Sequence, residues 1–129
     1  MGIPSAPEAD VPAVVRLDMR GAPESLWLVR LLTTALGAEA GFDVDDLDDV
    51  RIAVDELASQ VVQCLPESGH LAITFSMSPG EVAVAAEGTG HVVPRQPDEL
   101  LPVILDGLGA EWALVEPCGF TLRMRAGQR

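Results

Sequence analysis

The sequence predicts an α+β protein with two layers, in which three helices cover one face of a mostly antiparallel mixed sheet. Three observations lead to this prediction. The chain has 129 residues, 48% of them hydrophobic, which suits one domain with its own core. Two long segments repeat their apolar residues with the period of a helix. The strand-like segments come mostly as hairpins, and helices lie between them.

The first predicted element is a short strand over Val14–Met19, in which Val15, Leu17 and Met19 share one face. Residues 1–12, which precede it, contain three prolines and neither a basic start nor a long apolar run. We therefore predict a flexible tail over 1–12 and a single domain over 13–129. We also predict that the protein has no signal peptide and is cytoplasmic.

A first helix follows and runs to about Ala40. Pro23 and Glu24 suit its first turn, because proline needs no N–H partner there and glutamate favours the positive end of the helix dipole. Its apolar residues form more than one stripe: Leu26, Val29 and Leu36, then Trp27, Leu28, Leu31 and Ala35. Two interpretations stay open. Either the helix is deeply buried between layers, or another subunit or a partner covers the second stripe.

The second helix begins near Val44–Asp46 and continues to Leu65, where Pro66 ends it. Aspartates early in this segment favour the positive end of the helix dipole. One face of the helix is consistently apolar and predicts a core stripe of Leu47, Val50, Val54, Leu57, Ala58, Val61 and Leu65.

A hairpin comes next. His70–Met77 alternates as a half-buried strand, Ser78-Pro79-Gly80 forms the turn, and Glu81–Ala86 is the return strand. A glycine-rich loop, Gly88-Thr89-Gly90, follows directly. Beyond it, Asp98 can cap a third helix that ends at Gly109. Two last strands close the chain, Trp112–Glu116 and Phe120–Arg125.

The charge balance excludes several functions. The chain has 20 acidic residues, eight arginines and no lysine, for a net charge of −12. Such a chain repels phosphate, so we expect no direct nucleic-acid binding and no membrane attachment. Eight of the acids lie within Glu39–Glu56. A solvated helix face is the preferred interpretation, and a docking patch for a basic partner is the alternative. Cys64 and Cys118 are predicted to be buried free thiols, and two scattered histidines predict no metal site.

The segment Asp49–Gln60 reads DVRIAVDELASQ, and with the order of elements it resembles the anti-sigma-factor serine kinases. These belong to the GHKL superfamily, which has the histidine-kinase-like ATPase fold. The resemblance implies a glutamate that acts as the catalytic base, four residues before an asparagine that holds Mg²⁺ against the nucleotide phosphates. Glu56 matches the glutamate, and Gln60 stands at the metal-binding asparagine.

The two other motifs of this family are incomplete. The resemblance implies an Asp-x-Gly-x-Gly adenine site, in which Gly88 and Gly90 are kept but Ala86 replaces the aspartate. Glu87 is one residue out of register and is predicted to face the other way. The second glycine box, expected around 95–105, contains no glycine. We therefore expect no bound cofactor, or Mg-ATP if the nucleotide site still works.

Three functions remain possible. The first is an anti-sigma-factor-like regulator that binds a sigma factor, a STAS-type anti-anti-sigma antagonist, or both, with ATP binding weakened or lost. Its contact residues would be Trp27, Leu28 and Leu31, and the resemblance implies a homodimer. The second is an active serine-protein kinase that uses Mg-ATP on such an antagonist. The third is a scaffold with an unrelated role. Whether the protein is an enzyme is left open.

Overall fold

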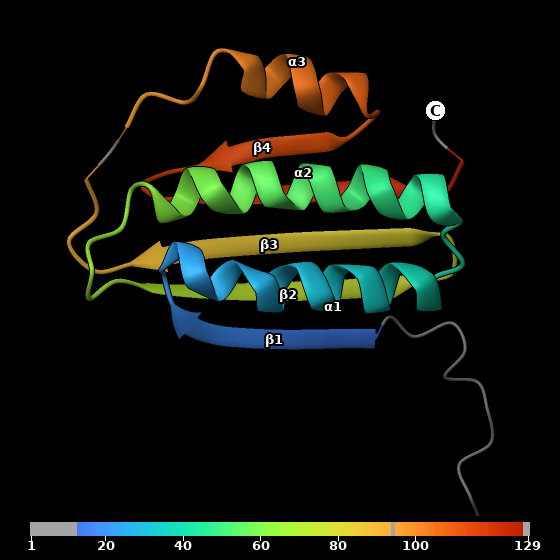
Figure 1. Cartoon of the computed structure of the whole chain (residues 1–129), viewed down its shortest axis with the longest axis horizontal. Helices are drawn as coiled ribbons and strands as arrows, with labels where there is room; N and C mark the ends of the chain where they lie inside the picture. The colour runs from blue at the N-terminus through green and yellow to red at the C-terminus, as the bar shows by residue number, and fades with distance from the viewer. Residues whose placement is uncertain (1–12, 94, 128–129) are drawn as a thin grey trace, which may run out of the picture.

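The computed structural model describes residues 13–93 and 95–127, so the predicted tail over 1–12 lies outside the described residues. A short 3₁₀ turn, Pro23–Ser25, precedes the first helix. The elements follow one another along the chain as shown in Figure 1: β1 (Ala13–Arg20), α1 (Leu26–Glu39), α2 (Val44–Val62), β2 (His70–Ser78), β3 (Glu81–Thr89), α3 (Leu100–Gly107), β4 (Glu111–Val115) and β5 (Gly119–Arg125).

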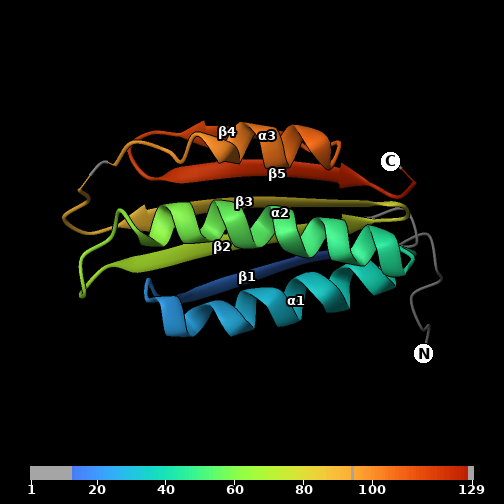
Figure 2. The same ribbon diagram turned by 45° about the horizontal axis from the view of Figure 1, so that its top comes forward.

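The strands form one five-stranded sheet in the order β1-β2-β3-β5-β4. Every neighbouring pair is antiparallel, so the prediction of a mixed sheet is wrong. The reason lies in the route of the chain. After β3 the chain passes through α3 to β4, which lies at the edge of the sheet opposite β1, and β5 then lies between β4 and β3. The helices lie together on one face (Figures 1 and 2), which confirms the two-layer α+β arrangement.

The second helix begins with a capping box. The Asp46 backbone N–H donates to the Asp43 carboxylate at 2.8 Å, and the Asp43 N–H donates to the Asp46 carboxylate at 3.1 Å. The helix ends three residues before the predicted Leu65. There the N–H groups of Cys64 and Leu65 bond to carbonyls three residues back, which tightens the last turn.

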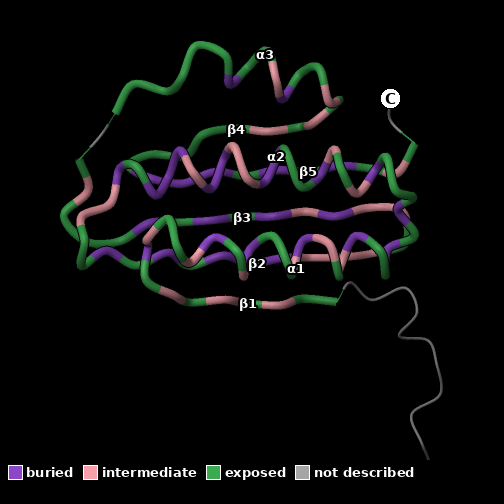
Figure 3. Tube along the Cα trace, viewed as in Figure 1, coloured by how far each residue is buried: buried purple, intermediate pink, exposed green. Residues whose placement is uncertain are grey.

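The core lies between α2 and the sheet (Figure 3). The predicted stripe of α2 is confirmed, because Val50, Val54 and Leu57 are at most 1% exposed. Leu47 and Leu65, at its two ends, are half-buried. These side chains pack against the sheet residues that alternate toward the helices: Leu71, Ile73, Phe75, Val82, Val84, Phe120 and Leu122. The apolar face of α2 and the apolar face of the sheet therefore pack together in one layer.

One further boundary differs from the sequence prediction. β3 extends to Thr89, so Gly88 and Thr89 pair with Leu71 and His70 and the predicted loop begins later. The Asp98 carboxylate accepts the Leu100 N–H at 2.9 Å, but the N-cap of α3 is Glu99, whose side chain makes no capping bond, so the predicted cap lies one residue before the helix boundary. Among the described residues, no helix is both long enough and apolar enough to cross a membrane.

Candidate functional site

The predicted base and metal ligand share one side of α2 but differ in their surroundings. Gln60 is only 8% exposed, so it is not a solvated surface residue. It lines a cavity of about 180 Å³ between the end of α2, the segment before α3 and the β4–β5 hairpin. Glu56 is half-buried and does not line that cavity. Their roles as base and metal ligand stay predictions.

The cavity beside Gln60 is lined by two charged side chains and two thiols in addition to Gln60 itself. Arg95 and Glu116 contribute opposite charges, while Cys64 and Cys118 contribute thiols. Its volume lies below the 300–1,000 Å³ that is typical of small-molecule sites.

The two glycines of the predicted adenine site make close packing contacts. A Cβ at Gly88 would meet Leu65 at 2.8 Å, Cys118 at 2.9 Å and Val61 at 3.2 Å. The Gly88 N–H donates to the Cys118 carbonyl at 2.7 Å. Gly88 therefore lets β3 approach the end of α2 and the hairpin, and the protein's own side chains fill that space.

Gly90 has a positive φ of 121°, a conformation that favours glycine. A Cβ there would lie 3.3 Å from the Gly69 backbone. Neither Gly88 nor Gly90 lines the cavity at Gln60. Their role in cofactor binding stays a prediction.

Ala86 and Glu87 point to opposite faces of the sheet, as the strand period predicts. Ala86 is 7% exposed on the helix side and pairs with Phe120, so the position of the missing aspartate lies within the apolar core. Glu87 is exposed on the open face. It cannot replace the aspartate without turning the strand over.

At the start of α3, carboxylates occupy the place where the family is expected to bind phosphates. Asp98 already takes the Leu100 N–H, and Glu99 is exposed beside it. Together with Ala86 and the filled space at Gly88, this arrangement does not fit Mg-ATP in the manner that the resemblance implies.

Both cysteines are free and buried, as predicted. Each thiol donates to a backbone carbonyl of α2 at 3.4 Å, Cys64 to Gln60 and Cys118 to Val61. Burial, and secondarily the neighbouring Cys64, raises the pKa of Cys118 to about 11. Cys118 is therefore a thiol rather than a thiolate at neutral pH, which disfavours nucleophilic chemistry.

An apolar groove lies on the outer surface, between α1 and α2. Trp27 and Leu31 are each 58% exposed, and Ile52 of α2 is 44% exposed. They line a hollow of about 570 Å³ together with Arg30, Thr34, Arg51 and Asp55. We call these seven residues the helix groove. Arg30 and Asp55 join its two sides by an ion pair of 2.7 Å.

The exposure of Trp27 and Leu31 contradicts the interpretation that the first helix is deeply buried between layers, while cover by a partner or another subunit stays a prediction. The second stripe is not buried within the chain. Leu28 is half-buried and lies outside the helix groove. Sequence reasoning missed Ile52, Arg30 and Asp55 as groove residues. The sequence offered one signal for Ile52, because it is an apolar residue of the second helix that lies outside the predicted core stripe.

The acidic segment Glu39–Glu56 has mixed roles. Asp46 is buried and accepts the Gly127 N–H at 3.0 Å in addition to its bond within the capping box. Asp48 pairs with Arg51 at 3.0 Å, and Asp55 pairs with Arg30. Part of the acidity is therefore structural, while Glu39, Asp45 and Asp48 remain exposed.

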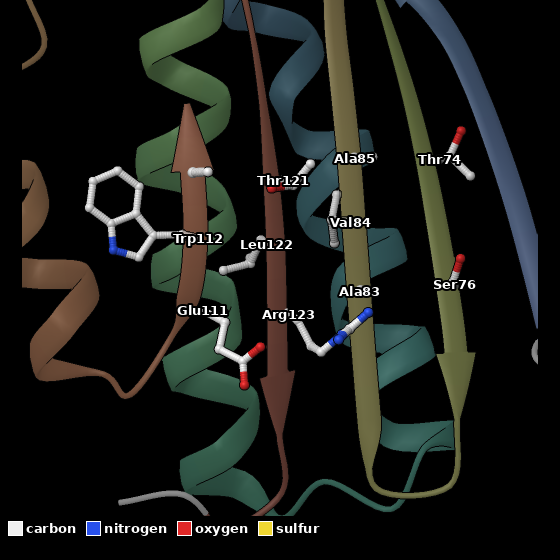
Figure 4. A pocket seen from close by; sticks show the side chains of 11 residues that line it. Thr74, Ser76, Ala83, Val84, Ala85, Glu111, Trp112, Thr121, Leu122 and Arg123 are labelled. Carbon is white, nitrogen blue, oxygen red and sulfur yellow. The ribbon is translucent and has the colours of Figure 1, made fainter. Parts of the chain in front are cut away.

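The open face of the sheet carries a second hollow, of about 440 Å³ (Figure 4). Small side chains from β2, β3 and β5 form its floor, among them Thr74, Ala85 and Thr121, with Glu111 and Arg123 near one end. Nothing in this set pairs a nucleophile with a base. Across 13–93 and 95–127, no three His, Cys, Asp or Glu side chains are grouped so that they could hold a metal ion.

Comparison with known proteins gives distant relatives. The chain is 24% identical over 94 residues to the serine-protein kinase RsbW of Bacillus licheniformis, and 26% identical over 93 residues to that of Bacillus subtilis. Each match covers 68% of this chain, and the chain spans 58% of the length of these relatives. No family model matches the chain. The similarity is to RsbW kinases in general, and the histidine-kinase-like ATPase fold stays a prediction.

Proposed function

We propose that this protein is an anti-sigma-factor-like regulator that acts by binding protein partners. The partners are a sigma factor, a STAS-type anti-anti-sigma antagonist, or both, and ATP binding is weakened or lost. The observation that supports a binding role most directly is the helix groove, where Trp27, Leu31 and Ile52 are exposed side by side.

The helix groove has the composition of a contact surface. Tryptophan and arginine are the residues that most often dominate binding energy, and the groove contains Trp27, Arg30 and Arg51. The Arg30–Asp55 ion pair is exposed, so it contributes little to folding and can exchange its partner at small cost.

Charge indicates a basic partner. The whole chain carries a net charge of −12, and Asp48 is an exposed carboxylate in the first turns of α2. A basic surface on the partner would speed association, and salt would weaken that effect. We therefore expect binding to slow as ionic strength rises.

Regulation in this proposal comes from competition between partners. The filled space at Gly88, the core position of Ala86 and the carboxylates at the start of α3 all support a loss of nucleotide binding. A switch that lacks a phosphoryl donor must depend on the relative affinities and concentrations of the partners.

The test compares substitutions inside the helix groove with a substitution of an exposed leucine outside it. Binding of a purified sigma factor and a STAS-type protein from the same genome is measured by surface plasmon resonance. Leu31→Ala and Trp27→Ala should each weaken binding at least tenfold while the far-UV circular dichroism stays unchanged. Leu100→Ala is the matched control, because Leu100 is 60% exposed on α3, outside the helix groove. Equal affinity for all variants would exclude the helix groove as the contact surface.

The second candidate function is an active serine-protein kinase, which the similarity to RsbW kinases favours. Calorimetry with Mg-ATP and Mg-ADP separates the two candidates, with Glu56→Ala as the control for chemistry rather than binding. No heat at millimolar nucleotide supports the binding module. Micromolar affinity would favour the kinase and call for a phosphorylation assay on the antagonist.

A further inference from the structure

The cavity beside Gln60 has the size of a small metabolite. It measures about 180 Å³ and lies where the end of α2, the segment before α3 and the β4–β5 hairpin meet. In Figures 1 and 2 these three segments lie together at one end of the sheet. A cavity of about 150 Å³ holds a molecule as large as benzene, so this one suits a ligand of about six to ten non-hydrogen atoms.

Gln60 gives the cavity a buried polar group without a partner. Its side chain is 8% exposed, and within the described residues its amide takes part in no hydrogen bond, because the Cys64 thiol bonds to the backbone carbonyl of Gln60 instead. No described side-chain nitrogen or oxygen is both fully enclosed and without a partner. The amide therefore faces the cavity that Gln60 lines. A buried amide favours a hydrogen-bonding ligand there.

Two opposite charges lie at the same cavity. Arg95 comes from the segment before α3, and Glu116 comes from the hairpin after β4. Neither belongs to the five ion pairs formed by the described residues, so they do not neutralise each other. A ligand between them can bond to a guanidinium and to a carboxylate at once.

The remaining wall is apolar. Leu114 and Val115 of β4 line it together with Pro97 and Pro117. Leu114 and Val115 are 38% and 48% exposed, so an apolar group of a ligand has surface to cover there. The two thiols add to the apolar wall, because each already donates to a carbonyl of α2 at 3.4 Å.

We propose that this cavity binds a free α-amino acid with an apolar side chain. Arg95 binds the ligand's carboxylate, and Glu116 binds its ammonium group. The Gln60 amide, which both donates and accepts, bonds to either charged group. The side chain of the ligand lies against the apolar wall. This inference goes beyond the proposed function, because it concerns a small ligand and depends on none of the protein partners.

Charge selects a zwitterion over an ion of one sign. The chain carries −12, which repels anions such as nucleotide phosphates. An anion would also leave Glu116 unpaired, and a cation would leave Arg95 unpaired. A zwitterion has no net charge to be repelled and pairs with both.

The experiment is a titration of the ¹⁵N-labelled full chain with L-leucine, followed by heteronuclear NMR. Leucine has about nine non-hydrogen atoms, which suits the volume. The chain contains no asparagine, so the side-chain amide signals come from glutamines alone. The Gln60 amide signal should shift, with a dissociation constant below about 1 mM.

Two truncated ligands test the need for both charges. 4-Methylpentanoate is leucine without the ammonium group, and 3-methylbutylamine is leucine without the carboxylate. Each should bind at least about tenfold more weakly than leucine, because one charge-assisted hydrogen bond is lost. Equal affinity for all three compounds would overturn the zwitterion.

Three variants assign the charged groups. Arg95→Gln and Glu116→Gln should each weaken leucine binding about tenfold or more. Arg95→Gln should not weaken binding of the amine, and Glu116→Gln should not weaken binding of 4-methylpentanoate. Glu87→Gln is the matched control, because Glu87 is exposed and lies outside the cavity, and it should bind leucine like wild type.

Three results would overturn the proposal. The first is an unshifted Gln60 amide at about 10 mM leucine. The second is a loss of leucine binding in Glu87→Gln as large as in Glu116→Gln. The third is displacement of leucine by Mg-ATP, which would show that the cavity accepts a nucleotide. Failure of a sigma factor or a STAS-type protein to bind would contradict only the proposed function.

Discussion

Replacement of Asp46 by alanine should destabilise the protein far more than the same change at its neighbour Asp45. Both aspartates lie in the first turn of α2. Asp46 is 6% exposed, and its carboxylate accepts the N–H groups of Asp43 and Gly127 at 3.1 and 3.0 Å. Asp45 is exposed. Asp46 therefore connects the start of α2 to the segment after β5.

The magnitude follows from these contacts. A hydrogen bond to a charged group contributes about 1.5–3 kcal/mol. Because Asp43 and Gly127 are both exposed, water can replace part of both bonds. We expect Asp46→Ala to cost about 2–4 kcal/mol. Asp45→Ala should cost less than Asp46→Ala, because Asp45 is exposed and water can replace the contacts that its carboxylate loses.

The assay is urea unfolding followed by far-UV circular dichroism for wild type, both alanine variants and Asp46→Asn. Asparagine keeps one acceptor oxygen without the charge, so Asp46→Asn should fall between wild type and Asp46→Ala. Equal losses for Asp46→Ala and Asp45→Ala would refute the reasoning, because they would mean that the burial of the Asp46 carboxylate adds nothing to its contribution.

Two further predictions concern the core. Leu57→Ala should lower the free energy of unfolding by about 2–5 kcal/mol, measured by chemical unfolding, since Leu57 is fully buried. Ile52→Ala on the same helix should cost well under half of that, because Ile52 is exposed. A loss under about 1 kcal/mol at Leu57 would contradict the assigned core face. The raised pKa of Cys118, about 11, predicts that stability falls as pH rises from about 9 to 11, because the unfolded thiol loses its proton first. The chain has no lysine or tyrosine to obscure this fall, and it should become shallower in Cys118→Ala; an unchanged slope would show that another group is responsible.

The elements of this protein could be predicted from the sequence because their signals are local. Alternation identified β1 and β2, and the helical period identified the buried face of α2. The end of α2 was placed too late, since the change to three-residue hydrogen bonds at Cys64 and Leu65 depends on what packs against that turn. The mixed sheet was wrong because strand order depends on the route through α3.

The candidate sites divide in the same way. That Gln60 and Glu56 share a side of α2 follows from their spacing, and the apolar surplus of α1 already indicated a second surface. Only the tertiary structure decided that Trp27 and Leu31 are exposed, that Ile52 joins them, and that side chains distant in sequence fill the space at Gly88.

The physical reason is the range of the interactions involved. Periodicity, caps and turns depend on neighbours within a few residues, so the chain alone determined where its helices and strands form. Whether a side chain faces water, a cavity or another strand depends on elements that meet only after folding. The burial of Asp46, unlike the other aspartates of its helix, and the place of β1 at the end of the strand order were decided at that stage.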